Sequence, residues 1–215
     1  MKLAQFRSEG RAAIKGNWNK AILISLIVSF LPAIGDLVSL AYDIVNNFES
    51  EINITLEIVI LLYSVMCLPL ILGEMYYFIN LSRGKSGSFS DVFRFYADIK
   101  VFFKAIFSLV YVFLLIFLWS LLLIIPGIIK GLSYSMSLYL IIDYPDLKIK
   151  DAISLSKKMM NGYKWKYFLL NLSFTGWILL GIITLFIGFI WIVPYISATN
   201  AAFYNYVKNQ YKAEE

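Results

Sequence analysis

The chain has 215 residues, a net charge of +5 and no histidine. Hydrophobic residues make up 60% of it and charged residues 15%, against roughly 45–50% and about 25% in globular domains. This composition excludes a disordered chain and leaves too few charges to cover a soluble domain, so it predicts an integral membrane protein. The missing histidines exclude serine–histidine catalysis and a Cys/His zinc site, and the single cysteine, Cys67, excludes an internal disulfide.

The first third of the chain predicts two membrane-spanning helices. Basic residues precede an apolar stretch at 21–42, and their segment is too long for a cleaved signal peptide. A weakly amphipathic helix is expected before it, at 3–15. The loop 43–53 is acidic and has no lysine or arginine. A second apolar stretch, 54–81, is longer than the roughly 20 residues that a bilayer requires.

The middle of the chain repeats this order of elements. Apolar residues recur at helical spacing within 89–100 between charged ones, which predicts an amphipathic helix on the membrane surface. The following stretch, 101–143, is apolar enough for two spans. We expect the break between them at Ile125-Pro126-Gly127, because proline begins helices well and continues them badly.

The last third has the same pattern. A second surface helix is expected at 149–162, within a polar segment that contains six lysines. The stretch 167–207 is again long enough for two spans, with a break near Gly188 to Pro194. The sequence therefore predicts an all-α polytopic membrane bundle, a single domain over 1–215. Six transmembrane helices form three hairpins, each preceded by an amphipathic helix on the inner surface.

The basic residues predict the orientation. Of the 19 lysines and arginines, five lie before the first span, five between Arg83 and Lys104, six between Lys148 and Lys166 and two in the tail, which leaves only Lys130. The positive-inside rule places these segments and both termini in the cytoplasm of a multi-pass plasma-membrane protein. The same segments are expected to attract anionic lipid of the inner leaflet, so the basic charge requires no nucleic acid.

Similar sequences around three prolines suggest a threefold internal repeat. Each proline lies in a second span, and aromatic residues follow it. The proposed copies and their prolines are 1–83 with Pro69, 84–145 with Pro126 and 146–208 with Pro194. Repeats in membrane proteins often frame a pathway, but they frame scaffolds too.

Polar groups inside the expected spans are the candidate site. Glu74 could bind a cation, relay protons or form an ion pair, because a charge in the bilayer is costly. Pro69 removes a backbone hydrogen bond near mid-bilayer, which points to a binding site or a hinge. Lys130 is expected to extend toward water along its stem. Asn171 and Asn200 are expected to form hydrogen bonds between helices. The prolines Pro126 and Pro194 are the corresponding hinge candidates.

Several runs of residues resemble an uncharacterised bacterial membrane family, domain-of-unknown-function family 975, which is common in Gram-positive bacteria. The runs are Leu121–Lys130, Ser133–Met136, Ala152–Ser156, Met159–Gly162, Pro194-Tyr195 and Ala202–Tyr204. The resemblance implies a multi-pass plasma-membrane protein without an assigned reaction. That family is distantly similar to the membrane domain of some glycerophosphodiester phosphodiesterases, whose catalytic barrel and histidines this chain lacks.

Two functions stay open at this point. The first is a non-enzymatic membrane protein that exports, senses or protects against an amphiphilic or cationic substrate, such as a small amphiphile or peptide. It predicts a cavity that reaches one membrane face and is lined by Glu74. The second is a structural or accessory partner that docks another protein through its cytoplasmic surface helices, with a closed core. No motif for a nucleotide or metal occurs, and no cofactor is expected.

Overall fold

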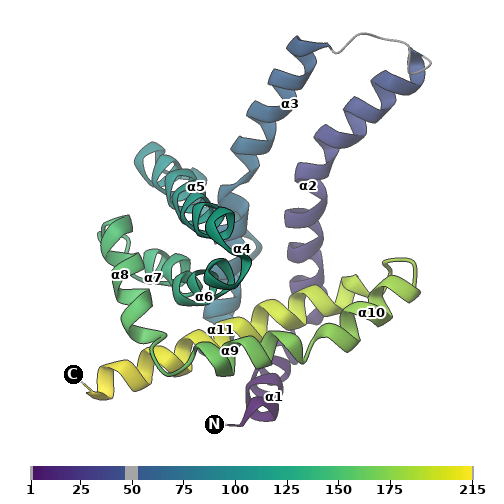
Figure 1. Cartoon of the computed structure of the whole chain (residues 1–215). Coiled ribbons are helices and arrows are strands. Elements are labelled where there is room, and N and C mark those ends of the chain that lie inside the picture. Colours follow the sequence, from purple (N-terminus) through teal and green to yellow (C-terminus); the bar gives the residue numbers. More distant parts are fainter. Residues whose placement is uncertain (1, 47–52, 215) are drawn as a thin grey trace.

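A computed structural model describes residues 2–46 and 53–214, and every regular element in these ranges is a helix. Three helix pairs extend from a common base and point in different directions (Figure 1). The expected loop 43–53 lies largely outside the described residues. The expected all-α class is confirmed.

The first helix pair follows α1 (Leu3–Ile14). One member of the pair is α2 (Trp18–Val45). The other runs antiparallel to it and consists of α3 (Ile54–Cys67) and its continuation α4 (Pro69–Ser82) (Figure 1). The buried residues Phe6, Gly10 and Ile14 recur every four positions along α1, which explains why this polar helix packs by one face only.

The second helix pair follows η1 (Phe89–Tyr96), a 3₁₀ helix where the sequence predicts an amphipathic α-helix. Its long member is α5 (Ile99–Leu122), begun by Asp98, whose carboxylate accepts two backbone N–H bonds. The return consists of α6 (Ile124–Tyr134) and α7 (Ser137–Asp143).

The third helix pair follows α8 (Ile149–Met159), whose buried residues again form one face. The outgoing member is α9 (Lys164–Leu172) and α10 (Thr175–Ile183), and the return is the single helix α11 (Phe189–Glu214). This pair lies across the direction of α2 and α3 rather than along it (Figure 1).

Two predicted breaks lie a few residues from their expected places. The second pair turns at Leu123, whose extended backbone separates α5 from α6, so Pro126 lies inside the first turn of α6. The third pair turns at 184–188, and Pro194 lies inside α11. Pro126 is tolerated there because the first turn of a helix has no internal partners for its N–H groups. Pro194 lies beyond the first turn of α11 and removes one backbone hydrogen bond of that helix.

Five of the described helices are long and apolar enough to cross a membrane. They are Trp18–Val45, Ile54–Ser82, Ile99–Leu122, Ile124–Asp143 and Lys164–Ile183. The helix α11, which covers the sixth expected span, is not among them. It contains several asparagine, serine, threonine and tyrosine residues, and many of its side chains are buried against other helices.

The three short helices that precede the pairs pack in a circular order. Each contacts the returning member of the preceding pair: η1 contacts α4, α8 contacts α6 and α7, and α1 contacts α11. In each contact a basic side chain lies over a tyrosine ring, at 4.3 to 5.5 Å from the ring centroid, which is within cation–π range. The three contacts are Arg94 over Tyr76, Lys157 over Tyr134 and Arg11 over Tyr195.

Small residues allow two of these contacts to be close. A Cβ atom on Gly73 of α4 would overlap the carbonyl group of Val92 in η1. A Cβ atom on Gly10 of α1 would lie 2.8 Å from the Cα of Thr199 in α11. Glycine is therefore required at both positions for the backbones to approach as they do.

At the break at Pro69, protein atoms donate hydrogen bonds to the backbone carbonyl groups. The Val65 carbonyl, which proline leaves without its usual partner, accepts a bond from the Leu68 amide at 3.2 Å. The neighbouring Met66 carbonyl accepts a 2.7 Å bond from the Tyr96 hydroxyl of η1. The broken helix is thus fastened to η1, which meets the requirement that backbone polar groups at membrane depth be paired.

Candidate functional site

Glu74 lies on α4 where this helix faces α2 and α11. The Ser25 hydroxyl of α2 donates a 2.6 Å hydrogen bond to Glu74 Oε1, and Ser197 of α11 also hydrogen-bonds the carboxylate. Within residues 2–46 and 53–214, both ion pairs end on Asp143 and neither involves Glu74. The carboxylate is therefore held by hydroxyl groups and faces no cation of the described chain.

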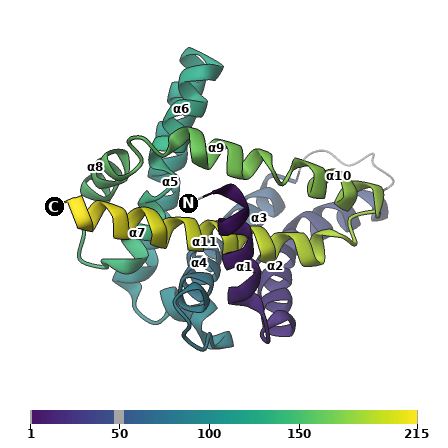
Figure 2. The same ribbon diagram turned by 90° about the horizontal axis from the view of Figure 1, so that it is seen from below.

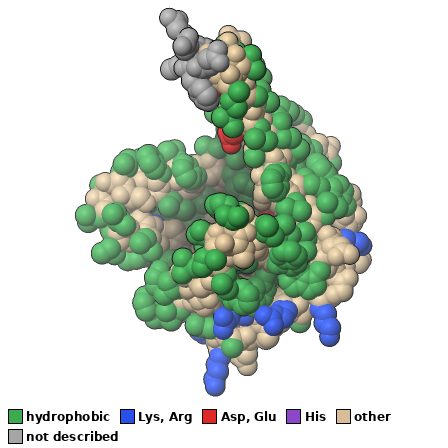
Figure 3. All heavy atoms as spheres, turned by 90° about the vertical axis from the view of Figure 1, so that its right-hand side faces the viewer, with side chains coloured by type: hydrophobic (Ala, Val, Ile, Leu, Met, Phe, Trp, Pro, Cys, Tyr) green, Lys and Arg blue, Asp and Glu red, His purple; other side chains and the backbone are tan. Residues whose placement is uncertain are grey.

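Ser25 also lines a cavity of about 590 Å³ between α2 and the turn from α10 to α11, here called the α2 cavity. Apart from Ser25 and Ser29, its walls are leucine, isoleucine, valine and phenylalanine side chains. Hydrophobic side chains dominate this side of the molecule, and a recess is visible between them (Figure 3). The expected cavity lined by Glu74 is not what the structure has: Glu74 is not on the wall of the α2 cavity, and its hydrogen-bond partner Ser25 is.

A polar stripe on α11 runs from Glu74 toward the opposite end of the site. Ser197, Asn200 and Tyr204 are spaced three and four residues apart, so they share one face of the helix. Asn200 Oδ1 is buried and has no hydrogen-bond partner. The Tyr204 ring stacks on Tyr139 of α7 with centroids 4.9 Å apart. The stripe thus offers a buried, unused acceptor near the face of α11 that meets Glu74.

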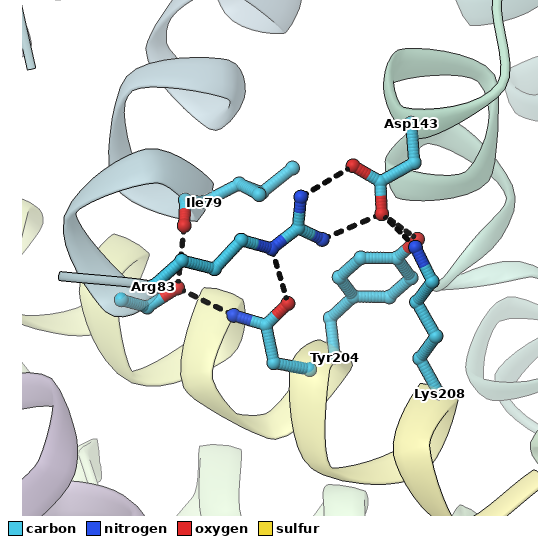
Figure 4. A network of polar contacts seen from close by, with 7 residues as sticks. Ile79, Arg83, Asp143, Tyr204 and Lys208 are labelled. Carbon is cyan, nitrogen blue, oxygen red and sulfur yellow. Dashed lines mark hydrogen bonds and ion pairs between the residues drawn. The ribbon is translucent and has the colours of Figure 1, made fainter. Parts of the chain in front are cut away.

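At the end of this stripe, Asp143 joins the three returning helices (Figure 4). Its carboxylate accepts bonds from Arg83 at 2.8 and 2.6 Å, from Lys208 at 2.5 Å and from the Tyr204 hydroxyl at 2.7 Å. Asn205 accepts a 3.0 Å bond from Arg83 Nε and donates to Ser82 Oγ. The group Arg83, Asp143, Tyr204, Asn205 and Lys208 is called the basal network below.

The basal network keeps its ion pair charged. Burial alone would lower the pKa of the Arg83 guanidinium, but its hydrogen bonds to Asp143 and the charge of that carboxylate raise the pKa above its ordinary value. The two N–H groups of Arg83 donate to both oxygens of Asp143, and this bidentate geometry fixes the orientation of the guanidinium group. The network therefore ties α4, α7 and α11 together, and its carboxylate, unlike that of Glu74, has two cations.

The other candidate residues have structural contacts. Lys130 Nζ lies 4.3 Å from the centre of the Trp119 ring in α5, so it forms a cation–π contact across its helix pair. Asn171 donates to the Tyr167 carbonyl of its own helix at 2.9 Å, where a bond between helices was expected. Pro126 and Pro194 lie near the starts of α6 and α11. None of these residues is on the wall of the α2 cavity.

Sequence reasoning missed the basal network and Ser25. Arg83 and Lys208 were counted only as charges that set the orientation, and Asp143 lies where a span meets a polar segment. One signal was available, because a lone carboxylate at the end of an apolar helix requires a partner. Nothing in the sequence identifies which of the many basic residues supplies it.

Comparison with known proteins supports the resemblance found in the sequence. Residues 121–211 match the model of the family described as protein of unknown function (DUF975). This stretch, less than half of the chain, is similar to that family. It begins at the end of α5 and covers α6 to α11 almost entirely, and thus Asp143, Tyr204, Asn205 and Lys208 but not Glu74. No curated protein and no solved structure matches the chain, so the distant similarity to glycerophosphodiester phosphodiesterases stays a prediction.

Proposed function

We propose that this protein is a non-enzymatic membrane protein that binds a cationic amphiphile, as part of exporting, sensing or protecting against it. The observation that carries the proposal is that Ser25 both lines the α2 cavity and hydrogen-bonds the unpaired Glu74. The apolar tail would occupy the cavity, whose volume lies within the 300–1,000 Å³ typical of ligand pockets. The cationic head would replace the Ser25 hydroxyl at Glu74.

The chemistry of the site favours a cation that donates hydrogen bonds. Glu74 supplies negative charge and Asn200 supplies a buried acceptor, while Lys and Arg side chains are absent from the walls of the α2 cavity. A buried charge without a partner is costly, and binding a cation would remove that cost. An anionic amphiphile would instead be repelled.

The architecture that accompanies this proposal is six spans in three hairpins, arranged as a threefold repeat, with both termini in the cytoplasm of a plasma membrane. Three observations support it. The short helices pack in a circular order, and each contact contains a basic side chain over a tyrosine. The first and third short helices, α1 and α8, are also each followed by a glycine with the same left-handed backbone. These are Gly16 at φ +84° and Gly162 at φ +80°.

Cysteine accessibility tests the orientation. In a Cys67→Ala background, we expect a membrane-impermeant thiol reagent added outside whole cells to label Asn46→Cys and Leu185→Cys. It should not label Ser86→Cys or Lys212→Cys until the cells are opened. Labelling of both Leu185→Cys and Lys212→Cys in whole cells would show that α11 does not cross, and the proposal would reduce to five spans.

Binding of dodecylammonium, a cation whose N–H groups can donate hydrogen bonds, is measured by isothermal titration to the protein in a neutral detergent and tests the function. We expect Glu74→Gln to weaken binding about tenfold, which corresponds to about 1.4 kcal/mol. Glu57→Gln is the matched control, because Glu57 also accepts a serine bond, from Ser39 at 3.2 Å, but lies away from the cavity. Ser29→Phe, which fills the α2 cavity, should also weaken binding of the cation. Equal binding by Glu74→Gln and wild type would refute the proposal.

A second candidate is a partner that docks another protein at the inner surface. One feature favours it. Aromatic rings, all exposed except the half-buried Phe102, follow one another from η1 into α5, with neighbouring centroids 5.5 to 6.3 Å apart. They are Phe89, Phe93, Tyr96, Phe102, Phe103 and Phe107. A photoreactive group at position 93 distinguishes the two candidates in cells. A protein adduct of one defined mass supports docking, and adducts with lipid alone speak against it.

A further inference from the structure

A second cavity, of about 720 Å³, lies between α1, the start of α2 and the third helix pair, and is called the α1 cavity. Seen from below, α1 crosses α11 beside α9 and α10 (Figure 2). Arg7, Arg11 and Lys15 line the cavity. Their spacing of four residues places all three cations along one face of α1.

The cations of the α1 cavity have no acidic partner. Its lining residues include no aspartate or glutamate, and both ion pairs of the described chain lie in the basal network. Glu9, the acidic residue of α1, lines a different cavity on the other side of the helix. The charged side chains that α1 presents to the cavity are therefore all cations.

The remaining walls are aromatic. Trp18, Trp177 and Tyr195 come from α2, α10 and α11. Arg11 lies over the Tyr195 ring at 5.5 Å, which orients its guanidinium beside the apolar wall. Tryptophan is enriched where a membrane protein meets the headgroup region, and α10 continues from this wall as an exposed apolar surface. An anion bound here would thus have apolar surface next to it.

We infer that the α1 cavity binds the phosphate of an anionic phospholipid. The two guanidinium groups match phosphate oxygens with paired N–H donors, and Lys15 adds a point charge. The acyl chains would lie along the apolar surface of α10. The inference rests on the proposed orientation, because it requires α1 at the inner membrane surface, but it is independent of Glu74 and the α2 cavity.

The test is thermal unfolding of the full-length protein in a neutral detergent, followed by tryptophan fluorescence. Phosphatidylglycerol, phosphatidylcholine or inorganic phosphate is added at equal ionic strength. A ligand that binds only the folded protein raises the Tm as its concentration exceeds the Kd. We expect phosphatidylglycerol alone to raise it. A similar rise with phosphatidylcholine would overturn the anionic headgroup, and a rise with inorganic phosphate alone would overturn the lipid.

The combined substitution Arg7→Gln, Arg11→Gln and Lys15→Gln should weaken the phosphatidylglycerol response at least about tenfold in concentration. The matched control removes the same amount of charge from three exposed lysines in and next to α8. It combines Lys148→Gln, Lys150→Gln and Lys158→Gln. It should keep the response. Equal losses in both variants would show that the lipid senses only total charge, and the inferred site would be wrong.

Two further variants keep the test decisive if the combined substitution does not fold. Lys15→Gln changes only an exposed lysine on the cavity wall and should weaken the response by a smaller factor. Arg7→Lys with Arg11→Lys keeps the charge but removes the paired donors, so it should also weaken the response. An unchanged response in both would refute phosphate recognition by this face of α1. Failure of the dodecylammonium experiment would leave these outcomes unaffected.

Discussion

The returning helix α4 and the far end of the second helix pair both carry large apolar side chains, yet they pack in opposite ways. Tyr77, Phe78 and Ile79 on α4 have no exposed surface. The side chains from Leu121 to Ile125, at the turn from α5 to α6, are 67 to 76% exposed. Hydropathy alone therefore does not distinguish a helix surface that meets protein from one that meets lipid. In this chain the difference comes from small and polar residues, which concentrate near the base.

The largest effect of a substitution is expected on the buried side of this comparison, at the Asp143 carboxylate of the basal network. Asp143→Asn removes the charge between Arg83 and Lys208, whose side chains are 28% and 16% exposed while that of Asp143 is 7% exposed. Two partly buried cations then face each other without an anion, which should cost about 3 kcal/mol of unfolding free energy. Thermal unfolding in detergent measures it, as a lower Tm.

The matched control for this change is Glu57→Gln, since Glu57 is exposed and accepts one serine bond. Its Tm should stay within the scatter of wild type. If the Tm of the Asp143→Asn protein equals that of the Glu57→Gln control, the basal network does not hold α4, α7 and α11 together.

A smaller effect is expected where η1 approaches α4. Gly73→Ala places a methyl group into the Val92 carbonyl, so η1 must move away, which should cost about 1–3 kcal/mol. Gly176→Ala on α10 is the control, because a Cβ there meets nothing within 4 Å and alanine favours the helix. Chemical denaturation of both variants in mixed micelles compares them. Equal stabilities would mean that the close contact at Gly73 is absent.

A third prediction concerns Ser156, whose buried hydroxyl connects α8 to the break between α6 and α7. It donates to the Ser133 carbonyl at 2.8 Å and accepts from the Met136 amide at 3.2 Å. Ser156→Ala leaves both backbone groups without this partner, which should cost about 1–3 kcal/mol, at the lower end if the helix relaxes. The control is Ser154→Ala on the exposed face of the same helix. Hydrogen exchange of the Met136 amide should rise in the first variant and stay unchanged in the second.

The sequence was sufficient for the all-α class and the order of the helical segments, but not for the number of membrane-spanning helices or for their packing. Apolar length and the polar segments between them locate α2, α5 and α8 to within a few residues. The exact turns differ because neither proline lies in a loop: Pro126 occupies the first turn of α6, where proline is tolerated, and Pro194 lies inside α11. The pairing of Asp143 with Arg83 depends on contacts 60 residues apart in the chain, which no local pattern encodes.

The same limit applies to the candidate site. Glu74 was a natural candidate, because a carboxylate within an apolar run is costly and therefore noticeable. Ser25 was not, since serine is common in spans and has many structural uses. That Ser25 connects Glu74 to the α2 cavity is a property of how α2 packs against α4, and it becomes visible only in three dimensions.

The smallest effect is expected in the exposed second helix pair, at the contact of Lys130 with Trp119. The ammonium group lies 4.3 Å from the ring centre, and such contacts contribute about 0.5–1 kcal/mol where water reaches them. Lys130→Gln, Trp119→Leu and the combined variant form a double-mutant cycle, whose coupling energy isolates this contact from other effects of each substitution. Unfolding in detergent should give a coupling of that size. A coupling near zero would show that Lys130 reaches water instead, and that the far end of this pair is held by apolar contact between α5 and α6 alone.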